Sequence, residues 1–239
     1  MKISRRPLVI GHRGASAEAP ENTLAAFRTA AAQGADWVEL DVRLTTDSEL
    51  SVIHDAHLSD GRIVADLARS DLPRHVPVLA EALAASVPMG VNVEIKHDPV
   101  EPGFADDRHI ADITVAAVAD SPVAVLVSSF DLLVIERVHQ LAPELPTAYL
   151  VVDPASPLDA VEACVAGGHS ALHPWNTSVD AALVDRCHDA GLAVNVWTVD
   201  DPDRILELAG FGVDGIVTNR PALALQVLLR ALENWNDQP

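Results

Sequence analysis

The stretch "VELDVRLTTD", residues 38–47, alternates apolar and charged side chains. In a β-strand successive side chains point to opposite faces, so the apolar residues would face one side while Glu39 and Asp41 face the other. Buried carboxylates are costly unless something compensates their charge. The stretch therefore predicts a buried strand whose second face carries two acids that need a compensating charge.

Similar apolar, β-branched runs recur along the chain, and segments with helical periodicity lie between them. The runs span residues 8–11, 37–42, 91–96, 124–130, 147–152, 170–175, 193–199 and 214–219. The helical segments begin near Glu21, Val78, Asp107, Leu132, Leu158, Val179, Pro202 and Ala222. Eight strand–helix pairs without a Pro/Gly/Ser-rich linker predict an α/β fold with a single (β/α)8 TIM-type barrel as one domain, residues 1–239. A short run at 50–55 is expected to extend a hairpin-like excursion of the second strand.

The run "VNVEIK", residues 91–96, repeats the alternating pattern and leaves Glu94 and Lys96 on the inner face. In TIM barrels the chemistry takes place at the C-terminal ends of the strands. We therefore expect three carboxylates, those of Glu39, Asp41 and Glu94, to converge near this mouth.

Three converging carboxylates need a compensating charge or must take up protons. Two like charges 4 Å apart repel by roughly 4 kcal/mol at an effective dielectric of 20. A hard-oxygen set without cysteine favours Mg²⁺ or Ca²⁺ over Zn²⁺. The alternative is a structural ion network in which the acids pair with Arg13, Arg43 and Lys96, and the alternation by itself does not decide between the two.

Imidazoles and an arginine stand at other expected strand ends. His12 and Arg13 follow the first apolar run directly, and His54 lies near the end of the short run 50–55. Two imidazoles beside a metal and basic side chains would supply acid–base chemistry at a phosphorus centre. A lone histidine at a strand end is more often structural, so these positions alone leave both interpretations open.

A set of motifs in order along nearly the whole chain resembles the glycerophosphodiester phosphodiesterase family. The motifs are "HRG" with "ENT" downstream, "GADWVELDVRLTTD", "VIHD", "VNVEIK", "SSFD", "VNVWTVDD" and "GVDGIVTNRP". The resemblance implies hydrolysis of glycerophosphodiesters to sn-glycerol 3-phosphate and an alcohol, with one divalent cation, Mg²⁺ or Ca²⁺. It also implies roles for eight residues: Glu39, Asp41 and Glu94 as metal ligands, His12 and His54 as the acid/base pair, Arg13 and Lys96 as phosphate contacts, and Trp197 as a wall of the substrate pocket.

The chain departs from the family pattern in two places. The sequence "HDAHLSDGRIVADL" stands where members often have a longer insertion, and Asn219 stands where many have Asp. Three alternative functions remain: a lysophospholipase D, a phospholipase C-like phosphodiesterase, and a barrel that binds a phosphate ester without turning it over.

The formal net charge of −19, with only two lysines, disfavours nucleic acid and anionic membranes as partners. A small-molecule substrate and no membrane insertion are expected, since no apolar run approaches the roughly 18 residues of a membrane span. The N-terminus lacks a signal-peptide core, and Cys164 and Cys187 lack CxxC spacing. A cytoplasmic protein with reduced thiols is predicted, and no pattern indicates its oligomeric state.

The remaining histidines and the C-terminus are expected to have minor roles. His173 is a candidate for substrate contact, and "ENWNDQP", residues 233–239, is expected to be a frayed tail. His57 is expected in an exposed loop. Five more are expected at the surface: His97, His109, His139, His169 and His188.

Overall fold

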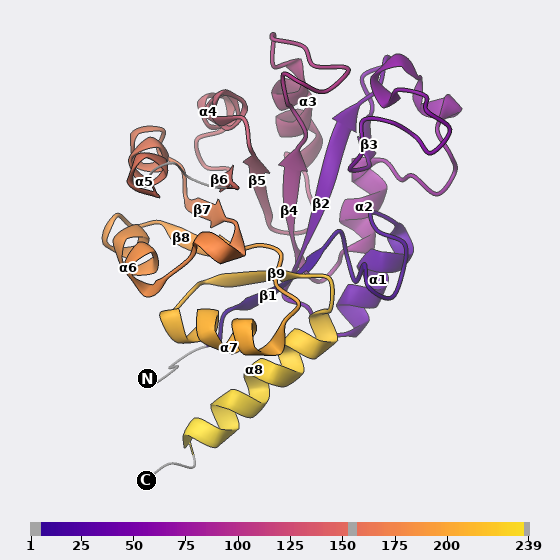
Figure 1. Cartoon of the computed structure of the whole chain (residues 1–239). Helices are drawn as coiled ribbons and strands as arrows, with labels where there is room; N and C mark the ends of the chain where they lie inside the picture. The colour runs from indigo at the N-terminus through magenta and orange to yellow at the C-terminus, as the bar shows by residue number, and fades with distance from the viewer. Residues whose placement is uncertain (1–5, 153–156, 237–239) are drawn as a thin grey trace.

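The computed structural model describes residues 6–152 and 157–236. Within these ranges, eight parallel strands form a closed barrel surrounded by eight α-helices (Figure 1). The strands are β1 (Leu8–His12), β2 (Trp37–Leu44), β4 (Gly90–Ile95), β5 (Val125–Ser129), β6 (Thr147–Val151), β7 (Ala171–Pro174), β8 (Ala193–Val196) and β9 (Gly215–Thr218). The helices are α1 (Leu24–Ala32), α2 (Leu79–Ala85), α3 (His109–Val118), α4 (Leu132–Leu141), α5 (Pro157–Ala166), α6 (Ala181–Asp189), α7 (Pro202–Phe211) and α8 (Pro221–Asn236).

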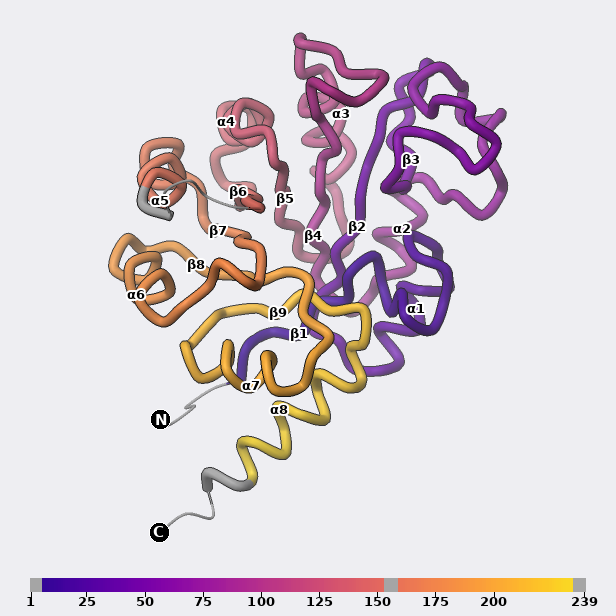
Figure 2. Tube along the Cα trace, in the orientation of Figure 1, coloured from indigo at the N-terminus to yellow at the C-terminus, as the bar shows by residue number. Residues whose placement is uncertain are grey.

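The barrel closes where the first strand meets both the second and the last. β1 pairs with β2 on one side and with β9 on the other, both in parallel register. Figure 2 shows this closure as indigo β1 lying beside yellow β9. The predicted (β/α)8 barrel is therefore confirmed, whereas the assignment of residues 1–239 to one domain stays a prediction.

The hairpin-like excursion is also confirmed. β3 (Leu50–Val52) pairs antiparallel with β2, with Val42 opposite Val52. Residues 53–78 then form a segment, which we call the excursion, beside the C-terminal end of β2 (Figures 1 and 2). It packs around a small cluster of its own, formed by Leu58, Val64, Leu72 and Val76.

The alternation of residues along β2 and β4 is as the sequence predicts. The outward residues of both strands join a core cluster with side chains of the covering helices, among them Phe27 of α1 and Ala82 of α2. Burial of these apolar side chains is the main favourable contribution to folding. The inward positions hold the polar residues Glu39, Asp41, Asn92 and Glu94, all of them buried.

Helix ends follow their sequence signals. Thr23 caps α1 by accepting a hydrogen bond from the main-chain N–H of Ala26. Gly34, Gly191 and Gly212 have positive φ just after α1, α6 and α7, where glycine ends a helix at low steric cost.

The C-terminus differs from its prediction. Helix α8 continues through Asn236, so residues 233–236 are helical and not part of a frayed tail, and residues 237–239 lie outside the described part of the chain. Cys164 and Cys187 are free thiols buried on α5 and α6, as expected. Among the described residues, none of the helices has the length and apolar character needed to cross a membrane. The cytoplasmic location stays a prediction.

Candidate active site

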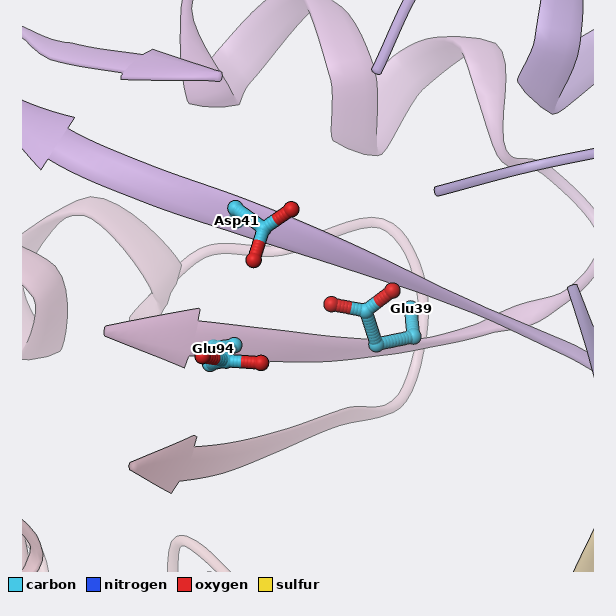
Figure 3. Close-up of side chains that lie close together, drawn as sticks. All are labelled: Glu39, Asp41 and Glu94. Atoms are coloured by element: carbon cyan, nitrogen blue, oxygen red, sulfur yellow. The ribbon is translucent and has the colours of Figure 1, made fainter. Parts of the chain in front are cut away.

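Three carboxylates meet inside the C-terminal end of the barrel. Glu39 and Asp41 come from β2 and Glu94 from β4, and Asp41 lies opposite Glu94 in the strand register. One oxygen from each side chain lies within 4.8 Å of the others. Figure 3 shows the three side chains gathered between the two strands. The predicted convergence is thus present in the structure.

Two oxygens of this acid triad have no hydrogen-bond donor. Glu39 Oε1 and Asp41 Oδ1 are buried, and none of the described residues donates a hydrogen bond to them. Buried polar atoms are normally hydrogen-bonded, so buried carboxylate oxygens without a hydrogen-bond donor indicate room for a further positive partner. A set made only of carboxylate oxygens fits Mg²⁺ or Ca²⁺.

The proton affinities of the triad reflect this crowding. Burial raises the pKa of Glu39 well above its ordinary value, and the charges of Asp41 and Glu94 add to the effect. Burial and then Asp41 raise the pKa of Glu94 to about 7. For Asp41, burial alone would raise the pKa, but Lys96 and Arg13 outweigh it and lower the value. Without a cation, the three acids therefore resist being ionised together.

Arg13 and Lys96 frame the triad from two sides. The Arg13 main-chain N–H donates to Glu39 Oε2 at 2.9 Å, and its Nε lies 3.3 Å from Asp41 Oδ2. Lys96 Nζ lies 2.7 Å from Glu94 Oε1 and 3.5 Å from Asp41 Oδ1. Burial opposes the charged form of Lys96, yet these carboxylates raise its pKa.

These contacts supply two parts of the ion network considered as an alternative to a metal site. Arg13 and Lys96 do pair with the acids, but Arg43 does not. Its Nε donates to the main-chain carbonyl of His54 at 2.7 Å, and its Nη2 lies 2.7 Å from Glu101. Because two cations face three buried acids and two oxygens still lack a donor, the network does not remove the need for further positive charge.

The loop from β1 to α1 is shaped to reach the triad. Arg13 and Asn22 have φ of 55° and 56°, a left-handed conformation that is uncommon outside glycine and concentrated at functional sites. Gly14, with φ of 87°, passes so close to α1 that a Cβ would lie 2.6 Å from Ala26. Glycine permits this close approach at the end of β1. Arg13, directly after β1, and Asn22, shortly before α1, both contact acids of β2.

The two candidate histidines lie at the same mouth with different partners. His12 Nδ1 lies 2.7 Å from Asn219 Oδ1, and His54 Nδ1 lies 2.7 Å from Asp55 Oδ1. Burial, with a further contribution from Arg13, lowers the pKa of His12. The half-buried ring of His12 is therefore held mainly neutral.

An aromatic wall links Trp197 to the charged centre. The Trp197 ring packs edge-on against Phe130 and Trp175, at centroid distances of 5.4 and 4.8 Å. Lys96 Nζ lies 5.8 Å from the centre of the Phe130 ring. A cleft of about 250 Å³ lies beside this wall, and Glu94, Lys96 and Phe130 are among its lining residues.

Three histidines differ from their expected places. His173 is fully buried within the barrel, where Asn195 bonds its Nε2 and burial lowers its pKa to about 3. It is therefore not accessible for substrate contact. His97 and His169 are buried rather than exposed: His97 Nδ1 lies 2.7 Å from Asp131, and His169 Nδ1 lies 2.8 Å from the Thr147 hydroxyl. Strand-end and loop positions gave no signal of these tertiary partners.

The sequence also left several site contacts unrecognised. Asn219 appeared only as a lost charge, whereas its side chain contacts His12 and also Asp200. Trp175 received no role at the mouth, and Arg43 was considered only as a partner of the three acids, whereas it contacts the His54 carbonyl and Glu101. For Asp200, the only sequence signal is its position directly after the predicted strand 193–199.

Comparisons with known proteins agree with this architecture. The profile of the Glycerophosphoryl diester phosphodiesterase family matches residues 12–223. A glycerophosphodiester phosphodiesterase of Caldanaerobacter subterraneus subsp. tengcongensis is 31% identical over 93% of this chain and 98% of its own.

Two solved structures have the same fold over nearly their full length. An Oleispira antarctica phosphodiesterase in complex with the product sn-glycerol-3-phosphate superposes with a TM-score of 0.80 and 26% identity, covering 98% of each chain. A glycerophosphodiester phosphodiesterase from Thermotoga maritima superposes with a TM-score of 0.80 and 27% identity, covering 93% of this chain and 99% of that one. With a family profile that spans most of its length and a curated relative above 30% identity, the chain belongs to the glycerophosphoryl diester phosphodiesterase family.

Proposed function

We propose that this enzyme hydrolyses glycerophosphodiesters to sn-glycerol 3-phosphate and an alcohol, with a divalent cation held by Glu39, Asp41 and Glu94. The observation that carries the proposal is the buried acid triad, whose oxygens Glu39 Oε1 and Asp41 Oδ1 lack donors. The family membership supports the reaction class, and the Oleispira relative in complex with sn-glycerol-3-phosphate supports the product.

The cationic side chains suit the phosphate group. Arg13 and Lys96 border the triad and are positioned to neutralise non-bridging phosphate oxygens and the charge that develops on them. A divalent cation, when bound, would add Lewis-acid polarisation of a phosphate oxygen. Within this proposal the glycerol phosphate end of the substrate lies over the triad, and Trp197 lines the pocket for the substrate.

Two proton transfers remain for the histidines. One imidazole accepts a proton from the attacking oxygen, which belongs either to water or to the glycerol 2-hydroxyl, whose cyclic phosphate water then opens. The other donates a proton to the departing alkoxide. His12 and His54 are the candidates, because both lie at the mouth and each has its Nδ1 held by an oxygen acceptor. The ring nitrogen Nε2 of each is then the atom left for the reaction.

Turnover with and without a chelator tests the proposal. The protein is treated exhaustively with EDTA, and release of sn-glycerol 3-phosphate from glycerophosphocholine is followed enzymatically. We expect activity to be lost and then restored by Mg²⁺ or Ca²⁺. Full activity after chelation would contradict the cation, and release of phosphocholine would instead indicate a phospholipase C-like reaction.

A pair of variants separates the triad from general effects of charge. Glu94→Gln should require a higher cation concentration for half-maximal activity. Glu162→Gln, at an exposed position on α5, changes the net charge by the same amount and should behave as the wild type. Binding of glycerophosphocholine without any turnover, at every cation concentration, would favour a non-catalytic phosphate-ester-binding barrel.

A further inference from the structure

The side chain of Asn219, directly after β9, lies between His12 and Asp200. Its Oδ1 is 2.7 Å from His12 Nδ1 and accepts a hydrogen bond from the Ser16 hydroxyl at 2.8 Å. Its Nδ2 donates to Asp200 Oδ2 at 2.6 Å. The three residues His12, Asn219 and Asp200 thus form a chain of hydrogen bonds across the ends of β1, β9 and β8, which are neighbours in the barrel.

Asp200 determines which way the amide of Asn219 points. A carboxylate only accepts hydrogen bonds, and Asp200 accepts three: from the Thr218 hydroxyl at 2.8 Å, from the Asn219 main-chain N–H at 2.8 Å and from Asn219 Nδ2. The next residue, Asp201, caps α7, so Asp200 is not used in the helix cap. With Nδ2 turned toward Asp200, Asn219 must present its oxygen to His12.

The amide oxygen in turn determines where the proton of His12 lies. An amide oxygen has no hydrogen to donate, so the short contact requires Nδ1 of His12 to carry the proton. In the neutral ring, Nε2 is then unprotonated, and no described residue forms a hydrogen bond with it. The opposite tautomer would place a proton on Nε2 and leave two acceptors facing each other at 2.7 Å.

We propose that Asn219, oriented by Asp200, is a positioning residue that fixes the tautomer of His12 with the proton on Nδ1 and so presents Nε2 as the proton acceptor of the reaction. The role of Nε2 as proton acceptor rests on the proposed function. The tautomer of His12 does not, because it is a property of the free protein. It assigns the acceptor role to His12 and leaves proton donation to His54.

Histidine-ring NMR of ¹⁵N-labelled full-length protein tests the tautomer directly. Two-bond ¹H–¹⁵N correlations distinguish a protonated from an unprotonated ring nitrogen, and the signals of His12 are identified by their loss in His12→Gln. We expect the Nδ1–H tautomer in the wild type. Asn219→Ala and Asn219→Leu should each shift His12 toward Nε2–H, because neither side chain offers an acceptor. Asp200→Ala should do so in part, by freeing the amide to turn.

A matched control removes the other donor to the same oxygen. Ser16→Ala deletes the hydroxyl that bonds Asn219 Oδ1 but leaves His12 and Asp200 in place, so the His12 tautomer should not change. His173 provides an internal reference, since Asn195 Nδ2 bonds its Nε2 and its tautomer should be the same in every variant.

Activity provides the second readout. Groups that orient a metal-ligating histidine are worth about 10- to 100-fold, and we expect a similar factor where the oriented histidine transfers a proton. The kcat for a glycerophosphodiester should therefore fall by that factor in Asn219→Ala and Asn219→Leu, with little change in KM. A His12 tautomer that stays Nδ1–H in both folded variants would overturn the inference, as would an unchanged kcat. Wild-type protein that shows the Nδ1–H tautomer but no turnover would contradict the proposed function while leaving the tautomer assignment standing.

Discussion

Asn22 forms two hydrogen bonds with Asp41: its Nδ2 donates to Asp41 Oδ2 at 2.8 Å, and its Oδ1 accepts from the Asp41 main-chain N–H at 3.3 Å. Both residues are buried. Asn22 and Arg13 both contact Oδ2, so the second oxygen, Oδ1, is left without a hydrogen-bond donor and lies 3.5 Å from Lys96 Nζ. Asn22 therefore orients the carboxylate of Asp41 within the triad.

Replacing Asn22 by alanine should loosen this orientation. We expect cation affinity and kcat/KM to fall by roughly 10- to 100-fold, because the group that orients a metal ligand is typically worth that much. Loss of the donor to a buried carboxylate should also destabilise the fold by about 1–3 kcal/mol. Titration calorimetry with Mg²⁺ or Ca²⁺ measures the affinity, and urea denaturation measures the stability.

The neighbouring residue gives the control for this prediction. Thr23→Ala removes the N-cap of α1, which should cost about 0.5–2 kcal/mol of stability. The Thr23 hydroxyl bonds Pro20 and Ala26, and not Asp41. Cation affinity should therefore stay as in the wild type. If both variants lost cation affinity equally, the effect would come from the loop as a whole and not from the two hydrogen bonds between Asn22 and Asp41.

The raised pKa of Glu94 makes the stability of the cation-free protein depend on pH. Between 4.5 and about 7, the unfolded chain has lost the proton of this carboxyl while the folded chain keeps it. The unfolded state then binds fewer protons, so the free energy of unfolding falls as pH rises through this window, by about 3 kcal/mol when the window has been crossed.

Glu94→Gln isolates this contribution, because a neutral side chain removes the titration. The free energy of unfolding of the variant relative to the wild type should rise from pH 4.5 to 7.5 in EDTA. Saturating Mg²⁺ or Ca²⁺ should stabilise the wild type more at pH 7.5 than at pH 5, since the ligands must be ionised to bind. Parallel stability curves for the two proteins in EDTA would contradict the prediction.

The parts of the site that depend on neighbouring residues in the sequence could be predicted, and the contacts between residues far apart in the sequence could not. The side-chain period of a strand is two, so the sequence alone places Glu39, Asp41 and Glu94 on the inner face, and parallel pairing of β2 with β4 brings them together. Nothing local indicated the partner of His12, because Asn219 lies 207 residues away and meets it only when β1 closes against β9.

The sequence also did not indicate how deeply individual side chains are buried in the barrel. His173 belongs to a short strand whose sequence resembles its neighbours, yet it lies inside the barrel, bonded to Asn195 of the next strand. Strand periodicity indicates a face but not how deep in the barrel a residue lies. The depth depends on strand tilt and stagger, which are set by the whole closed sheet.

Replacing either candidate catalytic histidine should lower turnover, whereas replacing a third histidine in the same region should not. His12→Ala and His54→Ala should each lower kcat by roughly 100-fold or more, as expected for loss of a proton-transfer group, with little change in KM. His57, exposed on the excursion three residues after His54, gives the matched control, and His57→Ala should keep near-normal turnover.

Steady-state kinetics at saturating cation measures these effects, and thermal melting confirms that each variant is folded. Lys96→Ala should also lose transition-state stabilisation, because its ammonium group is positioned for a phosphate oxygen. Near-normal turnover in either His12→Ala or His54→Ala would make that histidine structural.

Substrate preference should follow from the lack of exposed apolar side chains in the core of the excursion beside the mouth. The apolar side chains of the excursion, Leu58, Val64, Leu72 and Val76, are buried in its own cluster and are not offered to a bilayer. The net charge of −19 further disfavours anionic lipid surfaces. We therefore expect deacylated, water-soluble diesters to be better substrates than lysophospholipids.

The comparison is of kcat/KM for glycerophosphocholine, glycerophosphoethanolamine and lysophosphatidylcholine, with the phosphorylated product identified in each case. The first two should exceed the lysolipid by at least about tenfold, a difference of about 1.4 kcal/mol in transition-state binding. They should differ little from each other, because the leaving alcohol is expected to project from the mouth.

Trp197→Ala should raise KM for both soluble diesters with little change in kcat, as expected for a wall that contributes only to binding. A lysolipid preference would show that an acyl chain finds apolar contacts at the mouth, and would identify a lysophospholipase D.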